Sequence, residues 1–319
     1  MTFRAVGFAA GGPFAYATGH MGRKQKVIVV VGPTASGKSA LGVELALRYN
    51  GEIISADSRQ IYRGLDIGTA KITQEEMRGV PHHLIDIRDP GEIYTVQQFA
   101  EDAGSIIADI ARRGKLPIIV GGTSFYIDTL LGRIMPAPVE PDPQLRAGLE
   151  DEDVSALMER LRILDPVRAE SIDASNKRRV IRAIEIATAL GSVPRHEAAE
   201  SPYDALILGI KMEKEELRKR YAERASAWLT ANFKDEVAQL LASGITPHRL
   251  RELGFEYELG RELLEGTLNE DSFTDRFVEK NWQYAKRQYT WLKRDSTINW
   301  IYPSEKTEAD ILVQQFLIN

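Results

Sequence analysis

A short glycine-rich segment has the residue types and spacing of a phosphate-binding loop. It runs Gly32, Pro33, Thr34, Ala35, Ser36, Gly37, Lys38 and Ser39, which matches the pattern G-x-x-x-x-G-K-S. In such a loop the backbone amides surround phosphate oxygens, and the N-terminus of the following helix adds partial positive charge. Lys38 is expected to neutralise the terminal phosphates of the ligand, and the Ser39 hydroxyl to hold Mg²⁺. The alternative is a turn without a ligand, but the motif directly follows one apolar run and directly opens an amphipathic pattern, as a functional loop must.

An acid and a threonine follow two further apolar runs. Asp57 comes directly after Glu52–Ala56, and Thr123 follows Gly121-Gly122 at the end of another run. Ligands of open parallel sheets bind at the carboxyl ends of strands, so the phosphate loop, Asp57 and Thr123 are expected to line one crevice. Asp57 is then a candidate general base, and the alternative is that it only caps the next helix.

The elements that must position these residues alternate between strands and helices. Short apolar runs predict strands at Lys26–Val31, Glu52–Ala56, His83–Ile87, Leu116–Gly121 and Ala205–Ile210. Helical patterns lie between them at Lys38–Tyr49, Thr95–Arg113 and Phe125–Leu131. The first run is too uniformly apolar for a half-exposed strand, so we predict a central parallel strand there. The predicted fold class is α/β, with a parallel-sheet core like that of the P-loop NTPases.

The pattern changes between residues 136 and 201. Prolines at 136, 138, 141 and 143 form a linker, and the helical patterns Asp142–Leu164 and Asn176–Leu190 follow with no strand between them. We predict a helical insertion domain over 136–201. The rest, 24–135 and 202–319, is predicted to form the P-loop α/β core, with a helical C-terminal part after Lys214. Residues 1–23 are predicted to be a tag or a disordered leader, because the junction Gly19-His20-Met21 resembles a cloning remnant and makes Met21 the expected native start.

Composition excludes several classes of protein. The 319 residues are 43% hydrophobic and 27% charged, and the absence of cysteine excludes disulfides, thiolate zinc sites and a cysteine nucleophile. No apolar run approaches the ~18–20 residues that a membrane span needs, so we expect a cytoplasmic enzyme with no membrane partner. Because the net charge is −5, a nucleic-acid partner must be met by a local basic patch. Lys177–Arg182 forms such a patch, and the alternative is a solvated helix face.

The motifs of the chain also occur in a characteristic order. The phosphate loop is followed by Asp57-Ser58-Arg59-Gln60-Ile61-Tyr62, Asp66-Ile67-Gly68-Thr69-Ala70-Lys71, Pro81-His82-His83 and Asp86-Ile87-Arg88-Asp89-Pro90. Then come Gly121-Gly122-Thr123-Ser124-Phe125-Tyr126, Lys286-Arg287-Gln288 and Trp291-Leu292. This combination, over about 24–300, resembles the tRNA dimethylallyltransferase family. The resemblance implies transfer of a dimethylallyl group from its diphosphate to the exocyclic amine of the adenosine 3′-adjacent to the anticodon, with release of diphosphate.

The resemblance also implies a role for each motif. Asp57 accepts the proton of the attacking amine, and Thr123 donates a hydrogen bond near the bridging oxygen of the diphosphate. The phosphate loop and Arg224 hold the diphosphate, with Mg²⁺ as the cofactor at Ser39. The residues implied in tRNA binding are Asp57, Ser58, Arg59, Gln60, Thr123, Arg146, Arg178, Arg179, Val180, Ile181, Arg182 and Phe255. The expected partners are dimethylallyl diphosphate and the anticodon stem-loop of tRNA, and a monomer is expected because nothing suggests obligate assembly.

One position departs from the pattern of the family. The family usually has a Gly-Tyr pair followed by Arg or Lys in a segment that touches the tRNA, whereas this chain has Gly254, Phe255 and Glu256. Phe255 is still able to stack on a base, but Glu256 cannot pair with a phosphate. The details of base recognition therefore stay open.

Three other functions also stay open at this point. An adenylate isopentenyltransferase of cytokinin synthesis would share the loop, Asp57 and Thr123, but would not need an extended basic surface for a free nucleotide. A P-loop small-molecule kinase would place an acid where Gly121-Gly122-Thr123 stands. A non-catalytic RNA-binding module would leave the intact phosphate loop unexplained.

Overall fold

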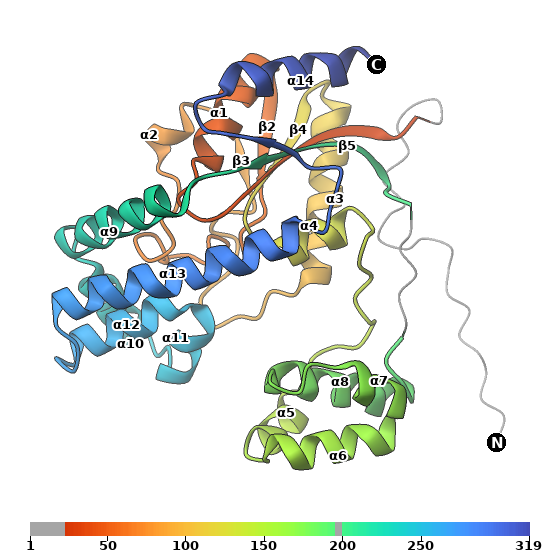
Figure 1. The fold of residues 1–319 in the computed structure, drawn as a ribbon, viewed down its shortest axis with the longest axis vertical. Coiled ribbons are helices and arrows are strands. Elements are labelled where there is room, and N and C mark those ends of the chain that lie inside the picture. Colours follow the sequence, from red (N-terminus) through yellow and green to blue (C-terminus); the bar gives the residue numbers. More distant parts are fainter. Residues whose placement is uncertain (1–22, 195–199) are drawn as a thin grey trace. The chain divides into compact units, whose positions relative to one another are not determined.

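The computed structural model describes residues 23–194 and 200–319. In these ranges six strands form one sheet in the order β3-β2-β4-β1-β5-β6, and every pairing is parallel. Helices lie on both sides of the sheet (Figure 1). The α/β prediction with a parallel sheet is therefore confirmed. The strands are β1 Gln25–Val31, β2 Gly51–Ser55, β3 His82–His83, β4 Leu116–Val120, β5 Tyr203–Ile210 and β6 Asn299–Ile301.

The central strand β1 is buried on both faces, as its uniform composition predicts. Its valines at 27, 29 and 31 pack against α3 and α4, whereas Ile28 and Val30 pack against α1 and α14 on the opposite face. Each such side chain contributes about 1.5–3 kcal/mol when it is fully buried. The burial holds the C-terminal end of β1, from which the phosphate loop starts. The four helices are α1 Lys38–Arg48, α3 Val96–Arg112, α4 Ser124–Leu130 and α14 Lys306–Ile318.

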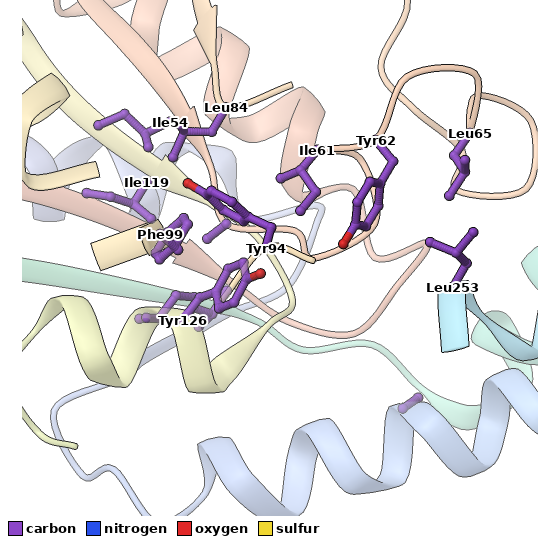
Figure 2. Close-up of a cluster of buried hydrophobic side chains, with 14 of the residues drawn as sticks. Ile54, Ile61, Tyr62, Leu65, Leu84, Tyr94, Phe99, Ile119, Tyr126 and Leu253 are labelled. Carbon is purple, nitrogen blue, oxygen red and sulfur yellow. The ribbon is translucent and has the colours of Figure 1, made fainter. Parts of the chain in front are cut away.

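The core on the α3 and α4 face extends to the loop after β2. Phe99 of α3 stacks on Tyr126 of α4 with ring centroids 4.2 Å apart, and Ile61 and Leu65 of that loop belong to the same cluster (Figure 2). Leu253, from the C-terminal part of the chain, completes the cluster at its far end. Packing of this loop fixes the backbone that carries Asp57.

The C-terminal part of the core is helical, as predicted, but it is more finely divided than the sequence indicates. Trp228, Phe233, Tyr257 and Phe277 form a chain of ring contacts that joins its helices. The helical stretch that starts at Lys214 is broken at Asn232, whose φ of 60° separates one helix from the next. The short strand β6 was not predicted. The helices are α9 Lys214–Thr230, α10 Phe233–Ala242, α11 Pro247–Leu253, α12 Phe255–Leu264 and α13 Glu270–Leu292.

The predicted strand His83–Ile87 is shorter than expected. β3 covers only His82–His83, and the short helix α2, Gln74–Met77, precedes it. Leu84 and Asp86 have φ values of 62° and 55°, which no strand accommodates. After His83 the chain bends out of the sheet, with Leu84 buried and Ile85 and Ile87 half-buried.

Residues 133–199 form a second compact unit, separate from the unit that ends at Gly132 and resumes at Glu200. Its described part has its own core, which includes Leu149, Leu157, Leu161 and Ile184. The predicted helix Asp142–Leu164 is two helices, because the acidic segment 151–153 interrupts it. The helices are α5 Pro143–Glu150, α6 Val154–Leu164, α7 Pro166–Ser171 and α8 Lys177–Leu190.

Two stretches lie outside the described residues. The predicted leader over 1–23 is one of them apart from Arg23, and the end of the predicted insertion, 195–199, is the other. Within the described ranges, no helix combines the length and the apolar character needed to cross a membrane.

Candidate active site

The phosphate loop folds as its glycines predict. Gly32 has a φ of 148°, and a Cβ atom there would lie 3.0 Å from the carbonyl oxygen of Ile210. Gly37 has a φ of 94° and is the N-cap of α1, so the helix begins at Lys38. The Lys38 ammonium donates to the carbonyl of Pro33 at 2.6 Å and thus curls over its own loop. Burial lowers the pKa of Lys38 to about 8, Asp57 opposes that shift, and Arg224 adds to it.

Helices α9 and α13 brace the loop from the other side. Arg224 donates to the Thr34 hydroxyl at 3.2 Å, and the Tyr221 hydroxyl donates to the Thr34 carbonyl at 3.3 Å. The Gln288 side chain accepts from the Thr34 amide at 3.3 Å and donates to the Gly122 carbonyl at 3.0 Å. Gln288 therefore ties the phosphate loop to the end of β4. Gln288 belongs to one of the motifs that carry the family resemblance, but no role could be predicted for it from the sequence.

Asp57 combines the two interpretations that the sequence left open. Its Oδ1 accepts from the backbone amides of Arg59 at 2.8 Å and Gln60 at 3.3 Å, so it caps the turn that follows β2. Its Oδ2 has no hydrogen-bond partner among the residues that the structure describes. One oxygen thus fixes the carboxylate, and the other is available to accept a proton.

Thr123 lies next to the same turn. Its Oγ1 accepts from the Ser58 amide at 3.1 Å, and its own amide donates to the Ala56 carbonyl at 3.2 Å. A Cβ at Gly121 would lie 2.1 Å from the Ala56 carbonyl oxygen, so only glycine lets the ends of β2 and β4 approach this closely. The close approach brings the hydroxyl of Thr123 beside Asp57.

These residues line two cavities. The larger one, about 410 Å³, is lined by phosphate-loop residues including Ser39 and by Arg220 of α9. The smaller one, about 240 Å³, is lined by Thr123, Phe255 and Tyr284 among others. Five side chains line both cavities: Thr34, Lys38, Asp57, Thr69 and Arg224. The structure thus brings the predicted base and the predicted diphosphate ligands together.

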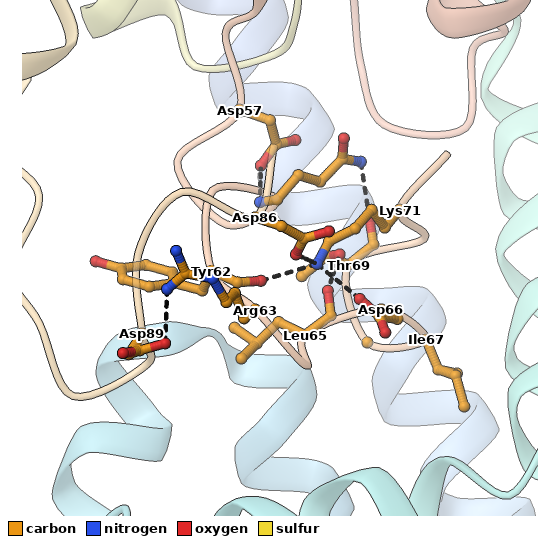
Figure 3. Close-up of polar contacts among 12 residues, drawn as sticks. Asp57, Tyr62, Arg63, Leu65, Asp66, Ile67, Thr69, Lys71, Asp86 and Asp89 are labelled. Atoms are coloured by element: carbon orange, nitrogen blue, oxygen red, sulfur yellow. Dashed lines mark hydrogen bonds and ion pairs between the residues drawn. The ribbon is translucent and has the colours of Figure 1, made fainter. Parts of the chain in front are cut away.

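The loop after Asp57 is held by a buried lysine. The side chain of Lys71 is only 6% exposed and binds the Asp66 carboxylate at 2.6 Å, the Tyr62 carbonyl at 2.8 Å and the Asp86 carboxylate (Figure 3). The Gln60 side chain donates to the carbonyls of residues 69 and 70, both at 3.3 Å. These contacts hold the loop whose residue Thr69 lines both cavities.

A carboxylate from α10 anchors the same loop. Glu236 accepts from the amides of Asp66 at 2.9 Å, Ile67 at 2.6 Å and Gly68 at 2.9 Å, and from the Tyr257 hydroxyl at 2.9 Å. A Cβ at Gly68 would lie 2.6 Å from the Tyr257 ring, so glycine is required there. The sequence analysis did not single out Glu236.

The residues predicted to bind tRNA on the first unit lie around the smaller cavity. Ser58, Arg59 and Phe255 line it, and Gln60 lines the larger one. Arg59 donates to the Glu252 carbonyl. Phe255 is half-buried and lies 6.4 Å from the ring of Phe277.

On the second unit the predicted tRNA residues fall into three groups. Val180 and Ile181, also predicted to bind tRNA, have their side chains buried in the core of that unit. Arg146 and Arg182 both pair with Glu185, which is only 2% exposed, the former at 2.8 Å. Only Arg178 and Arg179 are exposed, and no ion pair involves either of them in the described part of the chain. These two residues are the free cations of the predicted patch.

The fold and the site define an enzyme of the phosphate-loop class. The phosphate loop follows β1, a hydroxyl follows the adjacent strand β4, and an acid follows β2 on the far side of β4. Comparisons with known proteins identify the family within this class. A family model described as IPP transferase matches residues 60–295.

Curated relatives are similar over almost the whole chain. A tRNA dimethylallyltransferase of Geobacter sulfurreducens is 39% identical over 306 residues, which cover 92% of this chain and 98% of the relative. One from Geobacter metallireducens is 43% identical over 296 residues, which cover 88% and 94%. The chain therefore belongs to the IPP transferase family, and it is a transferase.

Solved structures agree with this assignment. The tRNA isopentenylpyrophosphate transferase of Bacillus halodurans matches with a TM-score of 0.69 and 36% identity, over 92% of this chain and 97% of that one. A eukaryotic dimethylallyltransferase acting on tRNA matches with a TM-score of 0.74 and 28% identity, over 92% of this chain and 78% of that one.

Proposed function

We propose that this protein is a tRNA dimethylallyltransferase, which transfers a dimethylallyl group from dimethylallyl diphosphate to the exocyclic amine of the adenosine 3′-adjacent to the anticodon. The observation that carries the proposal is the pair of cavities with Asp57 and Lys38 in both. A transfer between two substrates requires a base that lies beside the diphosphate site and is accessible to both substrates.

The larger cavity is proposed to take the donor. Its loop amides, together with Lys38 and Arg224, surround the space in which a diphosphate would lie. Both cations are poorly solvated, and this burial lowers the pKa of each of them. A charge held in a poorly solvated site stabilises the leaving diphosphate more strongly than the same charge in water.

The smaller cavity is proposed to take the adenine. Its lining combines the aromatic residues Tyr284 and Phe255 with the polar residues Thr123 and Asp57. In the reaction a bond forms between the amine nitrogen and C1 of the dimethylallyl group. The bond from C1 to the diphosphate oxygen breaks, and the diphosphate leaves with the electron pair. Asp57 accepts the proton that the amine loses.

The residues fit a magnesium ion bound mainly through the substrate. The described part of the chain holds no cluster of three or more acidic, histidine or cysteine side chains around a possible metal site. The exposed Ser39 hydroxyl lies at the larger cavity, and Mg²⁺ commonly keeps its waters and takes few protein ligands beside substrate phosphates. We propose Ser39 as that ligand, with the ion supplying charge neutralisation for the diphosphate.

The second unit is proposed to hold the anticodon stem-loop through Arg178 and Arg179. Phosphate contacts of this kind position RNA without reading its sequence. We also propose that the protein acts as a monomer in the cytoplasm, where its tRNA substrate is found.

The test is a transfer assay with labelled dimethylallyl diphosphate and, in separate reactions, bulk tRNA, AMP and ATP. We expect label in tRNA alone, and digestion to nucleosides should locate it on adenosine. Label in AMP or ATP but not in tRNA would contradict the proposal and favour a free-nucleotide acceptor.

A further inference from the structure

The smaller cavity contains a second carboxyl group, that of Glu256. Glu256 is the second residue of α12, and its Oε2 lies 2.5 Å from where a Cβ atom of Gly254 would be. The carboxyl group thus folds back over the N-cap of its own helix and lines the cavity together with Asp57. This is the position at which the sequence has an acid where the family commonly has a base.

In the described part of the chain, no other residue makes an ion pair or hydrogen bond with the Glu256 carboxyl group. The two nearest arginines are engaged elsewhere, Arg224 with Thr34 and Arg59 with the Glu252 carbonyl. Glu256 is therefore a polar group in the acceptor cavity that no contact within the fold accounts for. Such a group is available to a ligand.

We propose that Glu256 is a specificity-determining residue whose carboxyl group contacts the acceptor adenine, beside the carboxyl group of Asp57. This inference rests on the proposed transfer to adenosine. Two carboxyl groups that share a confined cavity do not both ionise readily, so one of them keeps its proton. Asp57 accepts hydrogen bonds from two backbone amides, whereas Glu256 accepts one only from its own amide.

The charged surroundings agree with this division of roles. Burial, with a smaller contribution from Asp57, raises the pKa of Glu256 to about 7, against the opposing effects of its own backbone amide, Arg59 and Arg224. The other ionisable groups around the cavity are Lys38, Tyr257, Tyr284 and Arg287. At and below neutral pH the neutral form of Glu256 is therefore well populated.

A neutral carboxyl group matches the edge of adenine that carries the amine. It offers one O–H donor and one carbonyl acceptor. That edge of adenine offers an amine N–H donor beside a ring nitrogen acceptor, which is the pattern that amide side chains read in the same way. Contact with Glu256 would orient the amine, and would leave its other hydrogen for Asp57.

The test compares pH profiles of kcat/KM for an anticodon stem-loop RNA at saturating dimethylallyl diphosphate. The variants are Glu256→Gln and Glu256→Ala. Glu258→Gln is the matched control, since Glu258 is a neighbouring acid on α12 that pairs with Lys280 at 3.9 Å. The amide of Glu256→Gln keeps the donor and acceptor of the neutral acid at every pH.

We expect kcat/KM of the wild type to fall between about pH 7 and pH 8, and the Glu256→Gln variant to lose that fall while staying within about threefold of the wild type at pH 6. The comparison is made below pH 8, because above it Lys38 loses its proton in both proteins. Glu256→Ala should lose about tenfold at pH 6, mainly through KM, and Glu258→Gln should follow the wild type.

Two results would overturn the inference. One is a Glu256→Gln variant as impaired at pH 6 as Glu256→Ala, with both melting like the wild type. The other is an alkaline fall that Glu256→Gln leaves unchanged. A wild type without transfer to RNA would instead refute the proposed function, so the two failures are distinguishable.

Discussion

The two units of the protein use their cations in opposite ways. In the first unit Lys38 and Arg224 are desolvated and bonded to the phosphate loop itself. In the second unit Arg178 and Arg179 are exposed, and the better buried Arg146 and Arg182 are paired with Glu185. A desolvated cation is suited to charge that develops in a transition state, whereas an exposed one is suited to RNA backbone. The comparison predicts that the first unit determines the chemical step and the second determines tRNA affinity.

The largest effect is expected at Asp57. The Asp57→Asn variant keeps an oxygen for the turn but cannot accept the amine proton, so single-turnover transfer should fall by about 10²–10⁴-fold. Binding of dimethylallyl diphosphate and of tRNA should stay close to the wild type. Wild-type transfer by this variant would reduce Asp57 to the cap of its turn.

Removal of the loop cation comes next. Lys38→Ala should slow transfer by about 10²–10³-fold, because a desolvated charge no longer meets the leaving diphosphate. Thr123→Ala removes one neutral hydrogen bond and should slow transfer by about tenfold or less.

The pKa of Lys38, lowered to about 8, also predicts that donor affinity of the wild type weakens above pH 8, where the ammonium loses its proton. Titration calorimetry with the donor between pH 7 and 9.5 checks this, and equal affinities throughout would contradict it.

A smaller effect is expected at Glu236, far from the reacting atoms. Glu236→Ala leaves the amides of residues 66–68 without their acceptor, which should lower the free energy of unfolding by about 1–3 kcal/mol. Because the loop lines both cavities, KM should rise by roughly tenfold while kcat changes less. Denaturant unfolding and steady-state kinetics measure the two effects. Loss of stability without any change in KM would show that the loop does not depend on Glu236 for its position.

The smallest effect is expected on the second unit. Arg178→Ala with Arg179→Ala should weaken tRNA binding several-fold and reduce the slope of log affinity against log salt by about one unit per lost contact. A control that removes two exposed cations from the first unit, Arg112→Ala with Lys306→Ala, should leave the slope unchanged. Arg182→Ala should instead destabilise the second unit, because it removes one of the two arginines that neutralise the charge of buried Glu185. Equal slopes in the paired variant and the wild type would identify the patch as a solvated helix face.

The comparison also explains what the sequence could predict. The phosphate loop, Asp57 and Thr123 were predictable because each follows a strand directly, and parallel strands bring their ends together. Gln288 and Glu236 were not, because each is one polar residue of an amphipathic helix whose partner lies far away in the chain, 254 positions in the case of Gln288 and Thr34. Val180 and Ile181 were predicted together with the arginines around them, although their side chains are buried. Their helical spacing with Ile184 indicates the buried face of α8.

One measurement tests the division between the units most directly. It is single-turnover transfer at saturating donor and increasing tRNA for the wild type, Asp57→Asn and the Arg178→Ala/Arg179→Ala variant. We predict that the arginine variant reaches the wild-type rate constant at high tRNA, whereas Asp57→Asn stays orders of magnitude slower at every concentration. A rate constant that stays low in the arginine variant at saturating tRNA, or that recovers in Asp57→Asn, would contradict the account.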